Sequence, residues 1–194
     1  MPQSIAKRLR NMPLQWMVIT IAVVVLIGSA AFGGLATAHP AGPATASPGH
    51  AIDGLPWDIT IVDTRIQSSL TGLTALRDGD RFLIVAATVT ITSPDARSDL
   101  SNALRLHGAT GLVNAYPSTI LLQRDGTALN FLNPGMTERL EFAWEQAAGA
   151  PIPTSVEVGV FDEEQKPDLG GNLAWFPDDQ PIAVVHSTVE AKQA

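Results

Sequence analysis

The sequence contains no cysteine, and this absence excludes several classes of protein at once. Without thiols there is no structural disulfide, no thiolate metal site and no cysteine nucleophile. Anchoring through a lipidated N-terminal cysteine, the usual tether of bacterial lipoproteins, is excluded as well. We therefore expect that an exported domain of this sequence is stabilised by packing alone.

Acidic residues are missing from the first quarter of the chain, and basic residues are scarce in the rest. Every Asp and Glu lies after Ile52, whereas Lys7, Arg8 and Arg10 precede all of them. The part beyond Ala38 carries 9 Lys and Arg against 19 Asp and Glu, a formal charge of −10. A surface this acidic repels phosphate backbones, so we expect no nucleic-acid partner.

Residues 14–38 form a run of 25 residues without a charge. As a helix this run would extend roughly 37 Å at 1.5 Å per residue, enough to cross a hydrocarbon core of about 30 Å. The basic residues ahead of it hold the N-terminus in the cytoplasm. The sequence therefore predicts a cytoplasmic segment at 1–13, a transmembrane helix in the lipid bilayer at 14–38, and a single-pass protein of the cell membrane with an extracytoplasmic C-terminal domain.

A cleaved secretion signal is the alternative, because Ala36-Thr37-Ala38 is a small-x-small site. A cleaved signal has an apolar core of about 7 to 15 residues. A core ending at Ile27 has that length but leaves the cut 11 residues away, and one ending at Phe32 spans 19 residues, which is too long. The pattern favours the uncleaved anchor, and secretion after cleavage at Ala38 stays open. Both interpretations place the domain outside the cytoplasmic membrane.

The next segment, 39–55, contains three prolines and three glycines and shows no periodicity. Its composition is typical of a semi-extended linker. From residue 56 the pattern changes to short alternating runs with turn signals between them, which predicts a folded domain over 56–190.

The alternating runs predict about seven strands of an all-β, antiparallel, immunoglobulin-like sandwich. "LLQRDGTALNFLNPG" is interpreted as a hairpin turning at Asp125-Gly126, with a second turn at 133–135. The segment 94–108 is the one candidate helix, although its residues 103–106 would also serve as a strand. Arg139, Glu141 and Glu145 are predicted to point outward. The predicted inward residues are Trp57, Ile59, Ile61, Leu83, Val85, Ala87, Val89, Ile91, Leu140, Phe142, Trp144, Val156, Val158 and Val160.

The order of these features carries a resemblance. A Trp-led first strand, "GDRFLIVAATVTIT", the "LLQRDGTALNFLNPG" hairpin and "RLEFAWE" follow one another between Trp57 and Val189. In this order the chain resembles the extracellular immunoglobulin-like domains of actinobacterial and other Gram-positive envelope proteins, many of them domains of unknown function. The chain has Thr92 where many members have Asn. The resemblance implies a fold and a location, and it implies no enzyme activity.

The residues that usually carry catalysis or bind metals are few and poorly spaced. The four histidines, His39, His50, His107 and His186, show no HxH or HExxH spacing, and no GxSxG or SxxK motif marks a nucleophile. Asp78-Gly79-Asp80 is interpreted as a turn feeding a strand, with a calcium site as the lesser alternative. A cut after Ala38 would expose the amine and imidazole of His39, a copper-binding arrangement by analogy, but on a flexible spacer. We therefore predict no catalytic residue, no metal site and no cofactor.

Two acidic clusters, 161–168 and 177–179, are interpreted as solvated turns between strands. Paired carboxylates can also cleave glycosidic bonds, and such loops could attract a cationic partner or divalent ions. Trp57, Trp144 and Trp175 are assigned to core and rim packing, with a binding platform as the alternative.

The leading hypothesis is a membrane-anchored interaction module without enzymatic activity, which binds a protein or envelope partner. The alternative is an accessory subunit of a membrane transport complex, whose helix itself forms part of the interface. Ser29, Gly33 and Gly34 could give this helix a small-residue face for pairing, although small residues are also common in membrane helices and near signal-peptide cuts. A secreted metal-binding or hydrolytic protein is the third hypothesis.

Overall fold

A computed structural model describes residues 42–70 and 77–191. The predicted cytoplasmic segment 1–13 and transmembrane helix 14–38 lie outside these residues. Within the two described ranges, no helix has the length and apolar character needed to cross a bilayer. The described domain is all-β, as the alternating runs predict.

Eleven strands build the described part of the chain. They are β1 (Ala44–Ala46), β2 (Ala51–Ile52), β3 (Trp57–Gln67), β4 (Arg81–Ile91), β5 (Leu104–His107), β6 (Thr119–Leu122), β7 (Thr137–Gln146), β8 (Ser155–Val160), β9 (Glu163–Pro167), β10 (Leu173–Pro177) and β11 (Ala183–Ala191).

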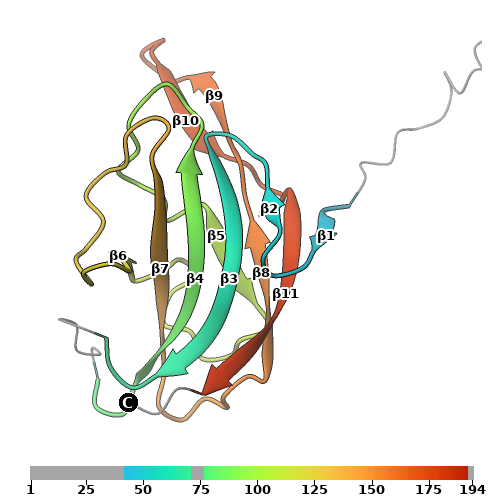
Figure 1. The fold of residues 1–194 in the computed structure, drawn as a ribbon, viewed down its shortest axis with the longest axis vertical. Helices are drawn as coiled ribbons and strands as arrows, with labels where there is room; N and C mark the ends of the chain where they lie inside the picture. Colours follow the sequence, from blue (N-terminus) through green and yellow to red (C-terminus); the bar gives the residue numbers. More distant parts are fainter. Residues whose placement is uncertain (1–41, 71–76, 192–194) are drawn as a thin grey trace, which may run out of the picture. The chain divides into compact units, whose positions relative to one another are not determined.

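Seven of these strands form two layers that face each other (Figure 1). One layer has the order β3–β4–β7–β6 and the other β5–β8–β11, with antiparallel pairing inside each layer. The apolar core between them takes residues from both layers, with Trp57, Trp144 and Phe142 among its largest fully buried side chains. The structure confirms the prediction of an all-β sandwich built from about seven main strands.

Two parallel contacts depart from the antiparallel prediction. β11 pairs in parallel with β1 at its start and with β3 at its end, where Val189, Glu190 and Ala191 lie opposite Thr64, Arg65 and Ile66. The second contact joins the two layers along one side. Alternation along a strand does not reveal its partner's direction, so the sequence contains no signal for either contact.

A β-bulge in β3 changes which residues face the core. The register with β4 shifts between Ile61 and Asp63. Before the bulge, Trp57, Ile59 and Ile61 point inward, and after it the inward residues are Thr64 and Ile66. The extra residue leaves Asp63 and Arg65 together on the outer face of the sheet.

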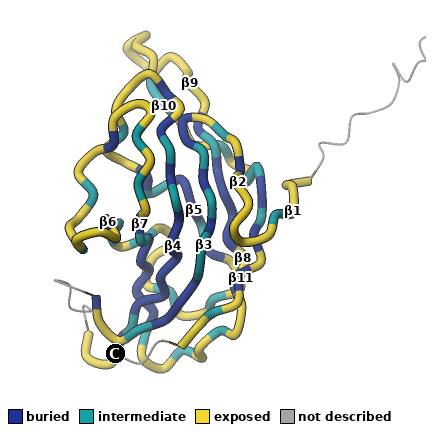
Figure 2. The backbone as a smooth tube through the Cα atoms, viewed as in Figure 1, coloured by how far each residue is buried: buried dark blue, intermediate teal, exposed yellow. Residues whose placement is uncertain are grey.

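The predicted inward residues of all four alternating runs are buried in the core. In Figure 2 the long strands are largely dark blue, the colour of buried residues. Glu145 lies on the outer face of β7, opposite Phe82 of β4, and is nevertheless only 2% exposed. Its strand edge is covered by the segment after β5, whose Val113 N–H donates to the Glu145 carbonyl at 2.9 Å.

The segment assigned to a linker, 39–55, contributes to the domain from residue 44 onward. β1 pairs with β11 and β2 pairs with β3, and the Ile52 side chain is buried in the core. The Pro56 carbonyl accepts the backbone N–H groups of Thr92 and Ser93. The domain therefore begins about twelve residues before the predicted boundary at residue 56.

The predicted turns at Asp125-Gly126 and 133–135 are present. Gly126 and Gly135 have positive φ angles of 69° and 73°, a backbone region that favours glycine. The strand after the first turn is reduced to a bridge between Leu121 and Ala128. In the segment 94–108 the strand alternative holds, because β5 occupies its end and no helix forms there.

Candidate functional site

The β9–β10 hairpin is an insertion between β8 and β11, which pair with each other directly (Figure 1). Its two strands form a separate sheet. A lone two-stranded hairpin is at best marginally stable in water. Contacts with the sandwich must therefore hold it in place.

Arg97 supplies the main contact. Its guanidinium carbon lies 5.4 Å from the ring centre of Trp57 and 5.4 Å from that of Trp175, so the cation is stacked between a core tryptophan and a hairpin tryptophan. It also forms an ion pair with Glu163 at the start of β9. The backbone of Arg97 is paired with that of Leu132 in both directions at 2.8 Å. One residue thus connects the hairpin to two distant parts of the sandwich.

The carboxylate of Glu163 is almost completely buried. Burial raises its pKa above the ordinary value, and the positive charge of Arg97 partly opposes this effect. Because the carboxylate needs Arg97 as counter-ion, we assign this pair a structural role.

A groove of about 400 Å³ lies beside this pair, between the hairpin and the turn before β3. Its apolar walls are Leu55 and Trp175, and its carboxylates are Asp162, Glu163, Glu164 and Asp178. The Leu55 N–H donates to Asp162 Oδ1 at 3.1 Å. The neighbouring Gly54 lies so close to the Asp162 carboxylate that a Cβ atom there would overlap it.

Asp162 has several carboxylates around it. Burial raises its pKa, the Leu55 N–H lowers it, and the nearby charges of Asp178 and Asp58 raise it further. Among the described residues neither Asp162 nor Asp178 forms an ion pair. The groove therefore contains negative charge that the described part of the domain does not neutralise.

We call this part of the molecule the hairpin end: residues 161–182, which contain the β9–β10 hairpin, with residues 53–58, 92–102 and 130–136. Backbone and side-chain hydrogen bonds connect these segments. Its acids are Asp53, Asp58, Asp95, Asp99, Asp162, Glu163, Glu164, Asp168, Asp178 and Asp179, against Arg97 and Lys166 as its cations. The formal charge is −8, out of −11 for all described residues.

Exposed apolar side chains gather at the same end. Of eight exposed large hydrophobic residues in the described ranges, five belong to it: Leu55, Phe131, Leu169, Leu173 and Phe176. Figure 2 shows the hairpin as almost entirely exposed. The other three, Val113, Tyr116 and Ile152, lie in the segments that follow β5 and β7.

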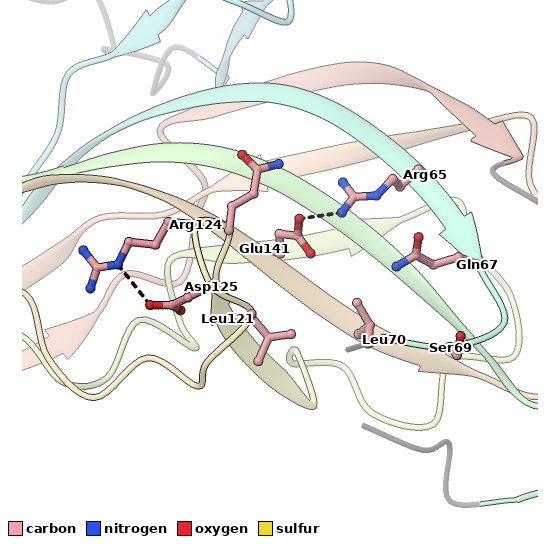
Figure 3. A pocket seen from close by; sticks show the side chains of 10 residues that line it. Arg65, Gln67, Ser69, Leu70, Leu121, Arg124, Asp125 and Glu141 are labelled. Carbon is pink, nitrogen blue, oxygen red and sulfur yellow. Dashed lines mark hydrogen bonds and ion pairs between the residues drawn. The ribbon is translucent and has the colours of Figure 1, made fainter. Parts of the chain in front are cut away.

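A second cavity of about 570 Å³ lies on the outer face of the β3–β4–β7–β6 sheet (Figure 3). The charged side chains at this cavity form ion pairs with neighbouring side chains of the domain. Arg65 binds Glu141 at 2.7 Å and Asp63 at 3.0 Å, and Arg124 binds Glu138 at 2.6 Å. Because these charges neutralise one another, the cavity attracts a charged ligand less strongly than the groove of the hairpin end does.

The histidines do not assemble into a site. His186 is an exposed residue of β11 that faces Glu157 at 3.6 Å, which fits the prediction of a strand histidine at a sheet surface. His50 and His107 are exposed, and His39 lies outside the described residues. No group of three or more His, Asp or Glu side chains within 42–70 and 77–191 is arranged to hold a metal ion.

The other candidate residues have specific structural positions. Asp80 is buried and accepts the Ala148 N–H at 3.0 Å, in the turn that leads into β4. Trp57 and Trp144 are core residues, and Trp175 packs at the rim on Arg97. Within the cluster 161–168, Glu163–Pro167 form β9 and Glu163 belongs to a buried ion pair, which differs from the predicted solvated turn.

Sequence reasoning did not identify Arg97. It lies in an irregular segment, "SPDARSD", among acidic residues that attract attention as a turn. Its partners Trp57, Glu163 and Trp175 are spread over more than one hundred residues, so no local spacing marks the cluster. The sequence offered one weak signal: Arg97 is a single basic residue within an acidic segment of a domain that contains tryptophans.

No family model matches the chain, and no curated protein matches it. Three solved structures are similar to it. An uncharacterised β-sandwich protein from Clostridium difficile has 15% identity and a TM-score of 0.44 over 75% of this chain and 96% of its own. A candidate lipoprotein from Staphylococcus aureus has 8% identity and a TM-score of 0.46 over 77% and 97%. A candidate lipoprotein from Bacillus subtilis has 16% identity and a TM-score of 0.38 over 69% of this chain and 39% of its own.

Proposed function

We propose that this protein is a membrane-tethered, extracytoplasmic interaction module, whose hairpin end contacts a partner protein. The observation that carries the proposal is the concentration of exposed apolar side chains at that end. Apolar side chains that gather on one surface and are surrounded by polar residues are typical of interaction sites. The location is supported by the uncharged run at 14–38 and by the basic residues ahead of it.

We also propose that the domain is an immunoglobulin-like sandwich of constant type. The strand order supports this assignment: β3–β4–β7–β6 corresponds to one sheet of such a domain, and β5–β8–β11 to the other. The hairpin is then an insertion between the last two strands. Loops at the ends of such sandwiches are common recognition surfaces.

Site-specific photo-cross-linking in native membranes tests the contact surface. A photoreactive amino acid replaces Leu169 at the tip of the hairpin in the full chain, and a matched variant carries it at Ile152. We expect a discrete cross-linked adduct from position 169 and none from position 152. Adducts from position 152 alone, or from neither position, would contradict the proposal.

The accessory-subunit alternative differs in where the essential contact lies. There the segment 14–38, with Ser29, Gly33 and Gly34 on one face, is the interface itself. Replacing 14–38 with an unrelated single-pass anchor should keep the adduct at position 169 if the module proposal is right. Loss of the adduct in the swapped chain would favour the alternative.

A further inference from the structure

We propose that the groove between Leu55 and Trp175 receives a lysine or arginine side chain of the partner protein. This inference rests on the proposed function and gives its contact surface a defined chemistry. The partner is a protein segment in which basic residues are interspersed with apolar ones. The apolar residues contact exposed apolar side chains of the hairpin, such as Leu169 and Leu173.

The first support is the distribution of charge within the groove. Glu163 is occupied by Arg97, and Glu164 binds Lys166 at 2.7 Å. Asp162 and Asp178 have no such partner among the described residues. Asp178 lies close enough to Asp162 for its negative charge to raise the pKa of Asp162. A cation placed between them would replace a repulsion with two attractions.

The second support is the composition of the walls. Lysine and arginine side chains have long apolar stems, which cover apolar surface while the charged head stays with polar groups. Leu55 is 55% exposed and lines the groove together with Trp175, so the groove offers such a surface. A guanidinium or ammonium beside the indole would also repeat the cation–aromatic stacking that Arg97 already makes with Trp57 and Trp175.

A divalent cation fits the groove less well. Calcium takes six to eight oxygen ligands, typically several from one short loop. Of the carboxylates that line the groove, that of Glu163 is already paired with Arg97 and that of Glu164 with Lys166. Within the described ranges, no cluster of acids has the arrangement of a metal site. Anionic lipid headgroups are repelled by the formal charge of −8 at this end.

The test uses the full chain in detergent micelles and two synthetic peptides of equal length. One is the capped hexapeptide with alternating lysine and leucine, and the other has glutamine in place of lysine. We expect the lysine peptide to bind, and the glutamine peptide to bind at least tenfold more weakly. Raising the sodium chloride concentration should weaken binding of the lysine peptide, because salt screens the attraction.

The variant D162N/D178N removes both unpaired charges with little change in shape. We expect it to bind the lysine peptide at least tenfold more weakly than the unmodified chain. The matched control is E157Q, which removes an exposed carboxylate of β8 that faces His186. The control should bind within twofold of the unmodified chain. Thermal unfolding of both variants verifies that the fold is retained.

The binding and cross-linking results together distinguish failure of the groove assignment from failure of the proposed function. Equal binding by the unmodified chain and D162N/D178N would overturn the groove assignment, as would saturable calcium binding that excludes the lysine peptide. If the position-169 cross-link persists while the lysine peptide fails to bind, the hairpin end is an interaction surface of a different chemistry. If both fail, the proposed function itself is wrong.

Discussion

At the scale of single residues, Arg97 has the largest structural role at the hairpin end. Its cation stacks between two tryptophans and neutralises a buried carboxylate. Each cation–aromatic contact contributes about 0.5–2 kcal/mol, depending on how far it is desolvated. Loss of the buried counter-ion is more costly, because the Glu163 carboxylate then keeps only the side-chain hydrogen bond from Asn102.

The first prediction concerns R97M. We expect this substitution to lower the free energy of unfolding by about 3 kcal/mol at neutral pH, since it leaves Glu163 buried without its counter-ion. The loss should shrink as the pH falls toward 4.5, because burial has raised the pKa of Glu163 above this ordinary value and the folded protein takes up the proton above it. Urea denaturation at pH 7 and pH 4 measures both values.

The double variant R97M/E163M provides the control for this prediction. Replacing both members of a buried ion pair with apolar residues is often close to neutral. We therefore expect the double variant to recover most of the stability that R97M loses. A double variant that is less stable than R97M would show that the ion pair is not the reason for the loss.

The second prediction concerns Asp162 and pH. Its folded-state pKa is raised by burial and by the charges of Asp178 and Asp58. Between the unfolded value near 3.8 and the raised folded value, the folded domain binds more protons than the unfolded chain. The stability that the protonated group provides is therefore fully present below pH 3.8 and is lost as the pH rises through the folded pKa.

We therefore expect D162N to be more stable than the unmodified chain at pH 7 and equally stable at pH 3. The asparagine side chain of this variant keeps an oxygen that can accept the Leu55 N–H. The comparison variant is D125N, for which the sign is opposite: hydrogen bonds from the Thr127 side chain and backbone lower the pKa of Asp125. D125N should lose stability at pH 7 and lose less of it at pH 3, because the contribution of a group with a lowered pKa disappears as the pH falls through that pKa. Thermal unfolding at the two pH values measures these differences, and a destabilised D162N at pH 7 would contradict the assignment.

At the scale of elements, the long strands could be predicted and their short companions could not. β3 up to its bulge, β4, β7 and β8 place an apolar residue at every second position, because one face of each packs on the core, and this period is visible in the sequence. β1 and β2 have three and two residues, too few for a period. Their pairing depends on the free edges of β11 and β3, which are properties of the assembled sheet.

The hairpin end shows the same limit. The sequence reveals its acidic clusters and tryptophans, and it does not reveal that "EEQKP" is a strand, because charged residues are depleted in strands. β9 forms because Glu163 faces Arg97 and because β10 supplies a partner. The core could thus be predicted from the alternation of apolar and polar residues along each strand. The candidate site could not, because it arises from contacts between residues far apart in the sequence.

The third prediction tests the domain boundary at this scale. A chain that begins at Gly42 should fold with full stability, because the compact unit begins there. A chain that begins at Trp57 loses the buried Ile52 side chain and the Pro56 carbonyl that accepts two backbone N–H groups. We expect a loss of about 3 kcal/mol from apolar burial and hydrogen bonding together.

Urea denaturation of three chains, beginning at Gly42, Ser47 and Trp57, separates the two short strands. The chain from Ser47 lacks only β1 and should lie between the other two. Equal stability of all three chains would mean that residues 42–56 are a linker, as their composition indicates.

At the scale of the whole molecule, charge is divided along the chain. The three cations near the N-terminus precede the uncharged run, and no acid occurs before residue 53. The described domain carries −11, and most of this charge is at the hairpin end. A basic flank before an apolar run directs the sequence after it across the membrane. We therefore expect the acidic domain to face outward.

The fourth prediction tests this orientation. In intact cells, externally added protease should remove a tag placed at the C-terminus, and the triple variant K7Q/R8Q/R10Q should protect a larger fraction of it. The physical reason is that Lys and Arg near the end of the apolar run set its orientation.

N-terminal sequencing of the recovered protein separates the two export routes: a start at Met1 or Pro2 indicates the anchor, and a start at His39 indicates cleavage. A tag that resists protease in intact cells and is removed after lysis would place the domain in the cytoplasm. The hairpin end could then not meet a partner outside the cell.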